Sequence, residues 1–113
     1  MFTWTRRDLA KAIIAAKARG VDVQVVIDHY QGNGAGAPIV KLLKQGGVSV
    51  RLSQGGPLLH HKFLYVDGKI LVNGSANWTK AAFTANDDCF MILYNLTDKQ
   101  SERMDDLWEA IAQ

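Results

Sequence analysis

Four polar side chains in the second half of the chain have types and spacing that suit the chemistry of a phosphate ester. His60 and Lys62 stand two residues apart, and Ser75 and Asn77 stand two residues apart further along. An imidazole is a nucleophile and a proton carrier near neutral pH, because its ordinary pKa is about 6.5. An ammonium group binds phosphate oxygens as a point charge, while hydroxyl and amide groups donate hydrogen bonds to them. These residues predict a site that binds a phosphodiester, with His60 as the nucleophile.

A β-hairpin is the element that must bring the two pairs together. Residues 60–66 and 69–73 are rich in strand-forming types, and Asp67-Gly68 between them is a strong signal for a two-residue turn. Residues two apart on a strand share a face and lie about 7 Å apart. The return strand ends near Gly74, level with the start of the first strand. The hairpin therefore predicts that the hydroxyl and amide lie beside the imidazole and ammonium.

Three further residues of this stretch have interpretations of their own. We interpret His61 as structural, because it points to the strand face opposite His60. Asp67 precedes a glycine, and we interpret it first as a turn former. Gly74 has no side chain, so it is expected to let the backbone come close to a ligand.

Helix and strand alternate in the first half of the chain, which predicts a parallel sheet with helical crossovers. Apolar strands suggest a sheet covered on both faces. Thr5 with Asp8, and Thr97 with Gln100, have the spacing of helix capping boxes. The predicted elements are a helix ending at Gly20, a strand over 21–28, a glycine-rich loop over 29–37, a helix over 38–45, strands over 48–52, 60–66, 69–73 and 88–94, an irregular or short helical segment over 74–85, and a helix over 97–112.

The composition is that of one globular domain, which we expect to span residues 1–113. Hydrophobic residues make up 48% of the chain and charged residues 21%, and the net charge is +2. This mildly basic balance is compatible with a polyanionic partner without requiring one. We interpret the single cysteine, Cys89, as a small core residue. No signal peptide and no membrane-spanning apolar stretch is visible.

The spacing of the polar residues resembles the HKD signature of the phospholipase D superfamily. The surrounding residues are similar to the single-motif bacterial nuclease branch of that family, over about residues 2–94. The matching pattern is His60-x-Lys62, four residues, Asp67, six residues, then Gly74-Ser75-x-Asn77.

The resemblance implies a mechanism in which two motifs face each other across one site. One histidine attacks phosphorus and becomes a phosphohistidine, while the other protonates the leaving oxygen. This chain holds one motif, so a second identical chain is expected to complete the site about a two-fold axis. No metal or other cofactor is expected, because lysines supply the positive charge.

The resemblance also assigns roles to individual residues. Asp88, with Asp87 as the fallback, is expected to hold the far nitrogen of His60. The expected catalytic residues are His60, Lys62 and Asp88, the phosphate-binding residues are Lys62, Ser75 and Asn77, and the supporting residues are Asp67 and Gly74.

The fold implied by the resemblance is a mixed β-sheet flanked by helices on both faces, an αβα sandwich. Its usual N-terminal helix and central strand would precede this chain, of which Phe2-Thr3 resembles the end of the strand. The leading functional hypothesis is a non-specific nuclease. The alternatives are hydrolysis of phospholipid head groups and a catalytically silent nucleic-acid-binding module. His29 and Tyr30 follow a predicted strand and are candidate substrate contacts.

Overall fold

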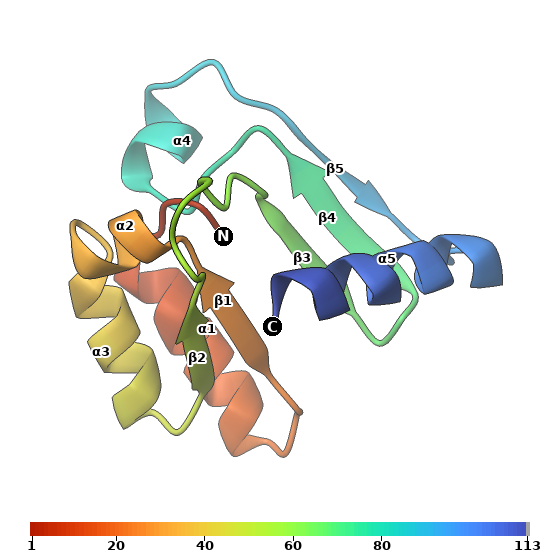
Figure 1. The fold of residues 1–113 in the computed structure, drawn as a ribbon, viewed down its shortest axis with the longest axis horizontal. Helices are drawn as coiled ribbons and strands as arrows, with labels where there is room; N and C mark the ends of the chain where they lie inside the picture. Colours follow the sequence, from red (N-terminus) through yellow and green to blue (C-terminus); the bar gives the residue numbers. More distant parts are fainter. Residues whose placement is uncertain (113) are drawn as a thin grey trace.

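The structure is a computed structural model that describes residues 1–112. Figure 1 shows an α/β fold in which helices and strands alternate in the first half and an antiparallel hairpin dominates the second. The elements are α1 (Arg7–Ala18), β1 (Gln24–Ile27), α2 (His29–Asn33), α3 (Ala37–Gln45), β2 (Ser49–Leu52), β3 (Phe63–Val66), β4 (Ile70–Gly74), α4 (Lys80–Thr84), β5 (Phe90–Leu93) and α5 (Asp98–Ile111).

The strands form two sheets, although the sequence predicted a single mixed one. β1 and β2 pair in parallel, and β3, β4 and β5 pair antiparallel in that order. The free edges of β1 and β3 face each other across a groove (Figure 1). The α/β class and the parallel first half are confirmed. The N-terminal segment pairs at one end of the groove between these edges, and Asp105, Trp108 and Ile111 of α5 line it further along.

The N-terminal segment, Met1 to Trp4, joins the two sheets at that end. The Met1 ammonium donates to a β1 carbonyl at 2.7 Å, and the Phe2 N–H donates to the His61 carbonyl at 3.1 Å. Trp4 forms a parallel β-bridge with Trp78, and their rings meet edge to face with centroids 4.4 Å apart. Through these contacts the segment pairs with its neighbours as a strand does, and it fixes the loop before β3 against the end of β1.

Helices cover both sides of this framework. α1 and α3 pack with β1 and β2 around the main core, whereas α5 crosses in front of β3 and β4 (Figure 1). The Tyr65 hydroxyl of β3 contacts the Asp105 carboxylate of α5 at 3.0 Å and donates to the Ser101 carbonyl at 3.2 Å. The buried core residues are Trp4, Ala10, Ile27, Ile39, Val40, Leu43 and Val48.

The two predicted capping boxes have different outcomes. At α5 the box is confirmed, because the Gln100 N–H donates to Thr97 Oγ1 at 3.2 Å and the Thr97 N–H donates to Gln100 Oε1 at 2.8 Å. At α1 it is wrong. The N-cap is Arg6, with no side-chain cap, and Arg6 Nε donates to Asp8 Oδ1 at 2.9 Å. The carboxylate is therefore paired with the neighbouring guanidinium rather than with the backbone of the predicted cap residue.

A short helix, α2, occupies part of the predicted glycine-rich loop. The Asp28 carboxylate accepts hydrogen bonds from the backbone N–H groups of Tyr30 and Gln31, at 3.1 and 3.0 Å. These bonds satisfy donors that a helix start leaves unpaired. The cap residue compensates for the poor helix propensity of Gly32, which the composition of the loop alone did not reveal.

β5 departs from the expectation of strands buried on both faces. Its four residues and Tyr94 are all exposed, with values from 42% for Leu93 to 66% for Tyr94. Cys89, predicted to lie in the core, is exposed as well. β5 is an edge strand of its sheet, like β3, and α5 covers β3 instead. Among the helices of residues 1–112, none is long and apolar enough to cross a membrane.

Candidate active site

His60 and Lys62 lie in a loop rather than on the predicted strand. Residues 53–62 form no helix or strand, and β3 begins at Phe63, opposite Asn73 of β4. The strand starts late because the His61 carbonyl accepts the Phe2 N–H from the N-terminal segment. The prediction for 60–66 was therefore three residues too long. The hairpin that follows has the predicted turn.

The imidazole and the ammonium nevertheless come together as expected. Lys62 Nζ lies 3.0 Å from His60 Nδ1 and 3.2 Å from Nε2, and it donates to the His60 carbonyl at 2.8 Å. His60 is exposed to solvent. Attack on a phosphate requires an accessible ring beside a cation. The phosphorus can then approach a ring nitrogen of His60 while the phosphate oxygens approach the Lys62 ammonium.

Phe2 is a member of this cluster that the sequence pattern did not single out. Its ring centroid lies 4.6 Å from that of His60, and Lys62 Nζ lies 5.3 Å from the Phe2 centroid. An aromatic face attracts a cation, and it restricts where the imidazole can turn. Phe2 belongs to a segment distant from the motif along the chain, so the spacing of the motif contained no signal for it.

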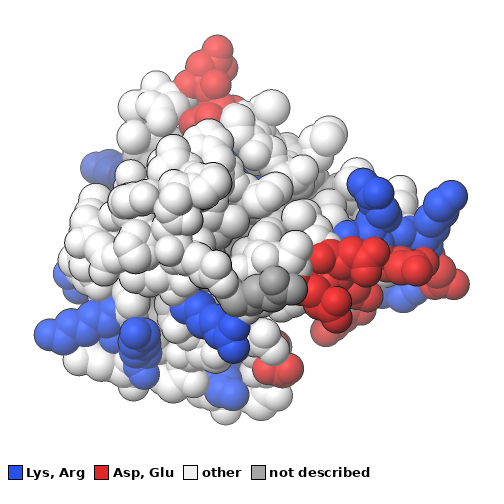
Figure 2. Space-filling model, viewed as in Figure 1, with Lys and Arg blue, Asp and Glu red and all other residues white. Residues whose placement is uncertain are grey.

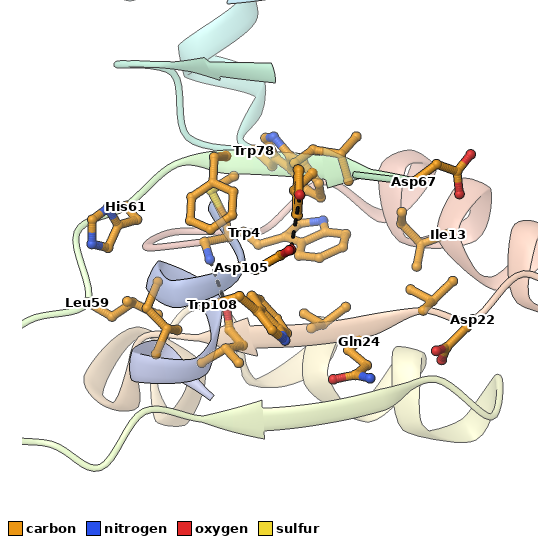
Figure 3. Close-up of a pocket in the computed structure, with 18 of the residues that line it drawn as sticks. Trp4, Ile13, Asp22, Gln24, Leu59, His61, Asp67, Trp78, Asp105 and Trp108 are labelled. Atoms are coloured by element: carbon orange, nitrogen blue, oxygen red, sulfur yellow. Dashed lines mark hydrogen bonds between the residues drawn. The ribbon is translucent and has the colours of Figure 1, made fainter. Parts of the chain in front are cut away.

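His61 lies on the other side of the loop from His60, as predicted. It lines the groove between β1 and β3, a cavity of about 380 Å³, near Trp4 and Leu59 (Figure 3). Partial burial lowers the pKa of His61, and the positive charges of the N-terminus, Lys62 and His60 lower it further. His61 is therefore neutral at pH 7, and it faces the groove rather than the His60–Lys62 cluster.

Asn77 is tied to the cluster through the N-terminal segment. The Thr3 N–H donates to Asn77 Oδ1 at 3.0 Å, while the neighbouring Phe2 packs on His60. Two consecutive residues thus contact the amide and the imidazole. With its oxygen used in this way, Asn77 retains its amide N–H groups as donors for a ligand.

Ser75 and Asp88 form a pair at the start of β5. Ser75 Oγ donates to Asp88 Oδ1 at 2.8 Å and accepts from the Cys89 N–H at 3.1 Å. Among residues 1–112, no hydrogen bond joins Asp88 to His60. The Asp88 carboxylate interacts electrostatically with Lys62 instead. Burial lowers the pKa of the Lys62 ammonium, and the negative charge of Asp88 partly opposes that shift. Asp88 is therefore near the cation of the cluster and bound to the serine.

The two supporting residues have structural reasons for their types. A Cβ on Gly74 would lie 2.3 Å from the Cys89 carbonyl oxygen and 2.5 Å from Phe90 Cα, so the close approach is to β5 rather than to a ligand. Asp67 has φ +54° in the hairpin turn, at the opposite end of β3 from Lys62. The interpretation of Asp67 as a turn former is confirmed.

The charges in view do not form one basic track. On the face shown in Figure 2, Lys and Arg side chains lie along the lower edge and beyond the acidic part of α5, and the centre is uncharged. Within residues 1–112, no three His, Cys, Asp or Glu side chains gather as metal ligands. The cation in the cluster with His60 is Lys62.

The sequence and the fold of this chain are similar to those of known proteins. Residues 1–110 match the family described as cardiolipin synthase, PLD-like domain. The solved structure of Nuc from Salmonella typhimurium, described as a phospholipase D family member, superposes with a TM-score of 0.90 at 33% identity, over 97% of this chain and 72% of that one. The chain belongs to the phospholipase D superfamily. NucT from Helicobacter pylori has the same superfamily fold, with a TM-score of 0.86 at 23% identity over 99% of this chain and 75% of its own.

Curated relatives of this chain are named as cardiolipin hydrolases. The mitochondrial cardiolipin hydrolase of Chlamydomonas reinhardtii is 34% identical over 96% of this chain and 49% of its own length. That of Xenopus laevis is 35% identical over 96% of this chain and 52% of its own. The chain thus spans about half the length of these relatives.

Proposed function

We propose that this chain is a metal-independent phosphodiesterase that cleaves nucleic acid through a phosphohistidine on His60. The observation that carries the proposal is the exposed His60 ring with the Lys62 ammonium 3.0–3.2 Å from its nitrogens. The superfamily and the similarity to Nuc support the reaction class. The resemblance to the single-motif nuclease branch supports nucleic acid as the substrate.

The proposed reaction has two displacements at phosphorus. A ring nitrogen of one His60 attacks, the bond to the leaving oxygen breaks, and a second, protonated imidazole gives its proton to that oxygen. The second imidazole then removes a proton from water, the water oxygen attacks phosphorus, and the P–N bond breaks. Lys62 and Asn77 are the proposed donors to the non-bridging oxygens, which carry the growing negative charge, and Ser75 joins them when its O–H turns from Asp88 Oδ1 to the phosphate.

We propose that the second imidazole is His60 of an identical chain. His61, the neighbouring candidate, faces the groove on the other side of the loop. A two-fold axis brings identical surfaces face to face, so two exposed His60 side chains can share one phosphate. The two rings then titrate as a pair, with one neutral and one protonated in the active state.

The direct test is cleavage of a labelled oligonucleotide in EDTA. We expect wild-type cleavage to persist in EDTA and to fall at least about a thousandfold in His60→Ala, which lacks the nucleophile. A phosphate adduct on His60 should be visible by intact-protein mass spectrometry. The matched control is His61→Ala, which removes the adjacent imidazole and should keep activity within a few-fold. Loss of cleavage in EDTA, or equal losses in both variants, would contradict the proposal. Tight binding without cleavage would point to a silent binding module.

The shared site can be tested by mixing chains. When wild-type and His60→Ala chains exchange freely, a site with one imidazole is inactive, so activity should fall as the square of the wild-type fraction. A site complete within one chain would instead give a linear decrease. The two curves differ most at equal mixing, where about one quarter or one half of the activity would remain.

Phospholipid head groups are the second candidate substrate. The exposed apolar side chains of β5 lie directly after Asp88 and Cys89, next to the Ser75 contact. The curated relatives are named cardiolipin hydrolases. Release of phosphatidic acid from cardiolipin vesicles, abolished by His60→Ala and faster than oligonucleotide cleavage, would favour this substrate over nucleic acid.

A further inference from the structure

Asp28 is the one fully buried charged side chain among residues 1–112. It directly follows β1, and both carboxylate oxygens accept backbone hydrogen bonds. Oδ1 accepts from the Leu59 N–H at 2.9 Å, and Oδ2 accepts from the N–H groups of Tyr30 and Gln31 at 3.1 and 3.0 Å. Hydrogen bonds to a charged acceptor are stronger than neutral ones, and a buried charge that loses its partners is costly. This carboxylate is therefore a rigid point of the fold.

The loop that delivers His60 is fastened at three points by residues 28–30. The His29 N–H donates to Ser53 Oγ at 2.9 Å, and His29 Nδ1 lies 3.2 Å from the Ser53 carbonyl oxygen. The Tyr30 hydroxyl accepts the Gly56 N–H at 3.1 Å. The Asp28 carboxylate accepts the Leu59 N–H. The loop forms no strand and is held instead by hydrogen bonds to residues at the end of β1.

The Leu59 contact differs from the other two in burial and position. Leu59 is 9% exposed, and its hydrogen bond to Asp28 lies in the interior, whereas Tyr30 is 50% exposed. Leu59 immediately precedes His60. On the other side, the His61 carbonyl accepts the Phe2 N–H. The backbone of the proposed nucleophile is thus fixed on both flanks.

We propose that Asp28 is a positioning residue that holds the His60 imidazole in its attacking position through the Leu59 amide. The proposal rests on the function proposed above. Asp28 does not touch the phosphate in this scheme. Its effect is geometric, because a displacement of about 1 Å of a reacting group can lower a rate about a hundredfold.

Removing the Leu59 N–H tests the contact without disturbing the carboxylate itself. Replacing the amide at Leu59 by an ester, through the α-hydroxy analogue of leucine, deletes this donor and keeps the side chain. The matched control is the same exchange at Gln31, which deletes a donor to the other oxygen of Asp28. Both changes remove one hydrogen bond from one carboxylate, so both should lower the melting temperature by similar amounts.

The two esters should separate in two readouts. The first is the heteronuclear NOE of the His60 amide, which should decrease in the Leu59 ester and stay unchanged in the Gln31 ester. The second is kcat for oligonucleotide cleavage, which should fall tenfold or more in the Leu59 ester with KM within about threefold, and stay within twofold in the Gln31 ester.

The outcomes distinguish this proposal from the function on which it rests. An unchanged His60 amide in the Leu59 ester, or equal losses of kcat in both esters, would overturn the positioning role. If wild-type protein cleaves no phosphodiester but the His60 amide loosens only in the Leu59 ester, the proposed function fails and the hold of Asp28 on the loop stands.

Discussion

The ammonium of Lys62 lies in an environment that lowers its affinity for a proton. Partial burial lowers the pKa of Lys62, and the nearby Asp88 carboxylate raises it by less. A lysine is charged below its pKa, so the positive charge is lost at a lower pH than for a free lysine. The proposed phosphate site should weaken on the alkaline side for this reason.

We therefore predict an alkaline limit to kcat/KM that belongs to Lys62. In wild-type protein the alkaline limb should fall below the ordinary lysine range, and in Asp88→Asn it should move to still lower pH, because the opposing charge is gone. Lys62→Arg keeps its charge at all accessible pH values, so whatever activity remains should lose this limb. A limb at the same pH in all three proteins would exclude Lys62 as its source.

Asp67 offers a test of structural against chemical importance within the motif. Its positive φ suits Asp and Asn but strains β-branched residues. Asp67→Asn should therefore retain wild-type stability and cleavage. Asp67→Val should lower the free energy of unfolding by roughly 1–3 kcal/mol, measured by urea unfolding, through backbone strain. A large loss of cleavage in the stable Asn variant would show a chemical role instead.

The capping residues of the helices behave differently, although their sequences look alike. Thr97 caps α5 in a complete capping box, whereas Thr5 makes no cap at α1. Thr97→Ala should lower the free energy of unfolding by about 1 kcal/mol, and Thr5→Ala should change it by less than about 0.5 kcal/mol. Urea unfolding of both variants provides the comparison. Equal effects would mean that the caps do not account for the difference.

Elements with a local signal were predictable, and those set by distant contacts were not. The turn at Asp67-Gly68 and the cap at Thr97 follow from neighbouring residues alone. The start of β3 depends on Phe2, which takes the carbonyl that a longer strand would need. In the same way, α2 depends on how the Asp28 side chain turns back to the following amides.

The same distinction applies to the candidate site. Spacing placed His60 and Lys62 together because two residues of nearly extended backbone bring side chains to one side. It did not identify Phe2. The resemblance, rather than the spacing, assigned Asp88 to His60; that role stays a prediction, and the Asp88 carboxylate accepts a hydrogen bond from Ser75. Contacts between segments far apart in the chain leave no fixed spacing, so the contact of Phe2 with His60 could not be found from the motif.

At the scale of the whole molecule, the buried N-terminus links stability to pH. Burial lowers the pKa of the Met1 ammonium to about 5, against an attraction from Asp28 that raises it, whereas an unfolded chain end has an ordinary pKa near 8. Between these values the unfolded state binds more protons than the folded state. Stability should therefore rise with pH between about 5 and 8.

The measurement is the urea midpoint of the chain with a free Met1 amine across that pH range. The N-terminally acetylated chain is the control, because it has no amine to titrate. It should lose most of the slope, and the lowered pKa of His61 contributes to the slope that remains. Parallel slopes in the free and acetylated chains would contradict this origin.

The bare edge of β5 has a practical consequence for anyone handling the purified protein. An edge strand with unpaired backbone groups on its outer side and exposed apolar side chains is a template for pairing with a strand of another molecule. Pairing of β5 with β5 of a second chain closes about a two-fold axis and leaves neither edge free, so the apparent particle mass should double and then level off as the concentration rises. Light scattering over a concentration series will therefore report this adhesion, and cleavage should be measured below the concentration at which β5 edges pair but above that at which the proposed His60 dimer dissociates.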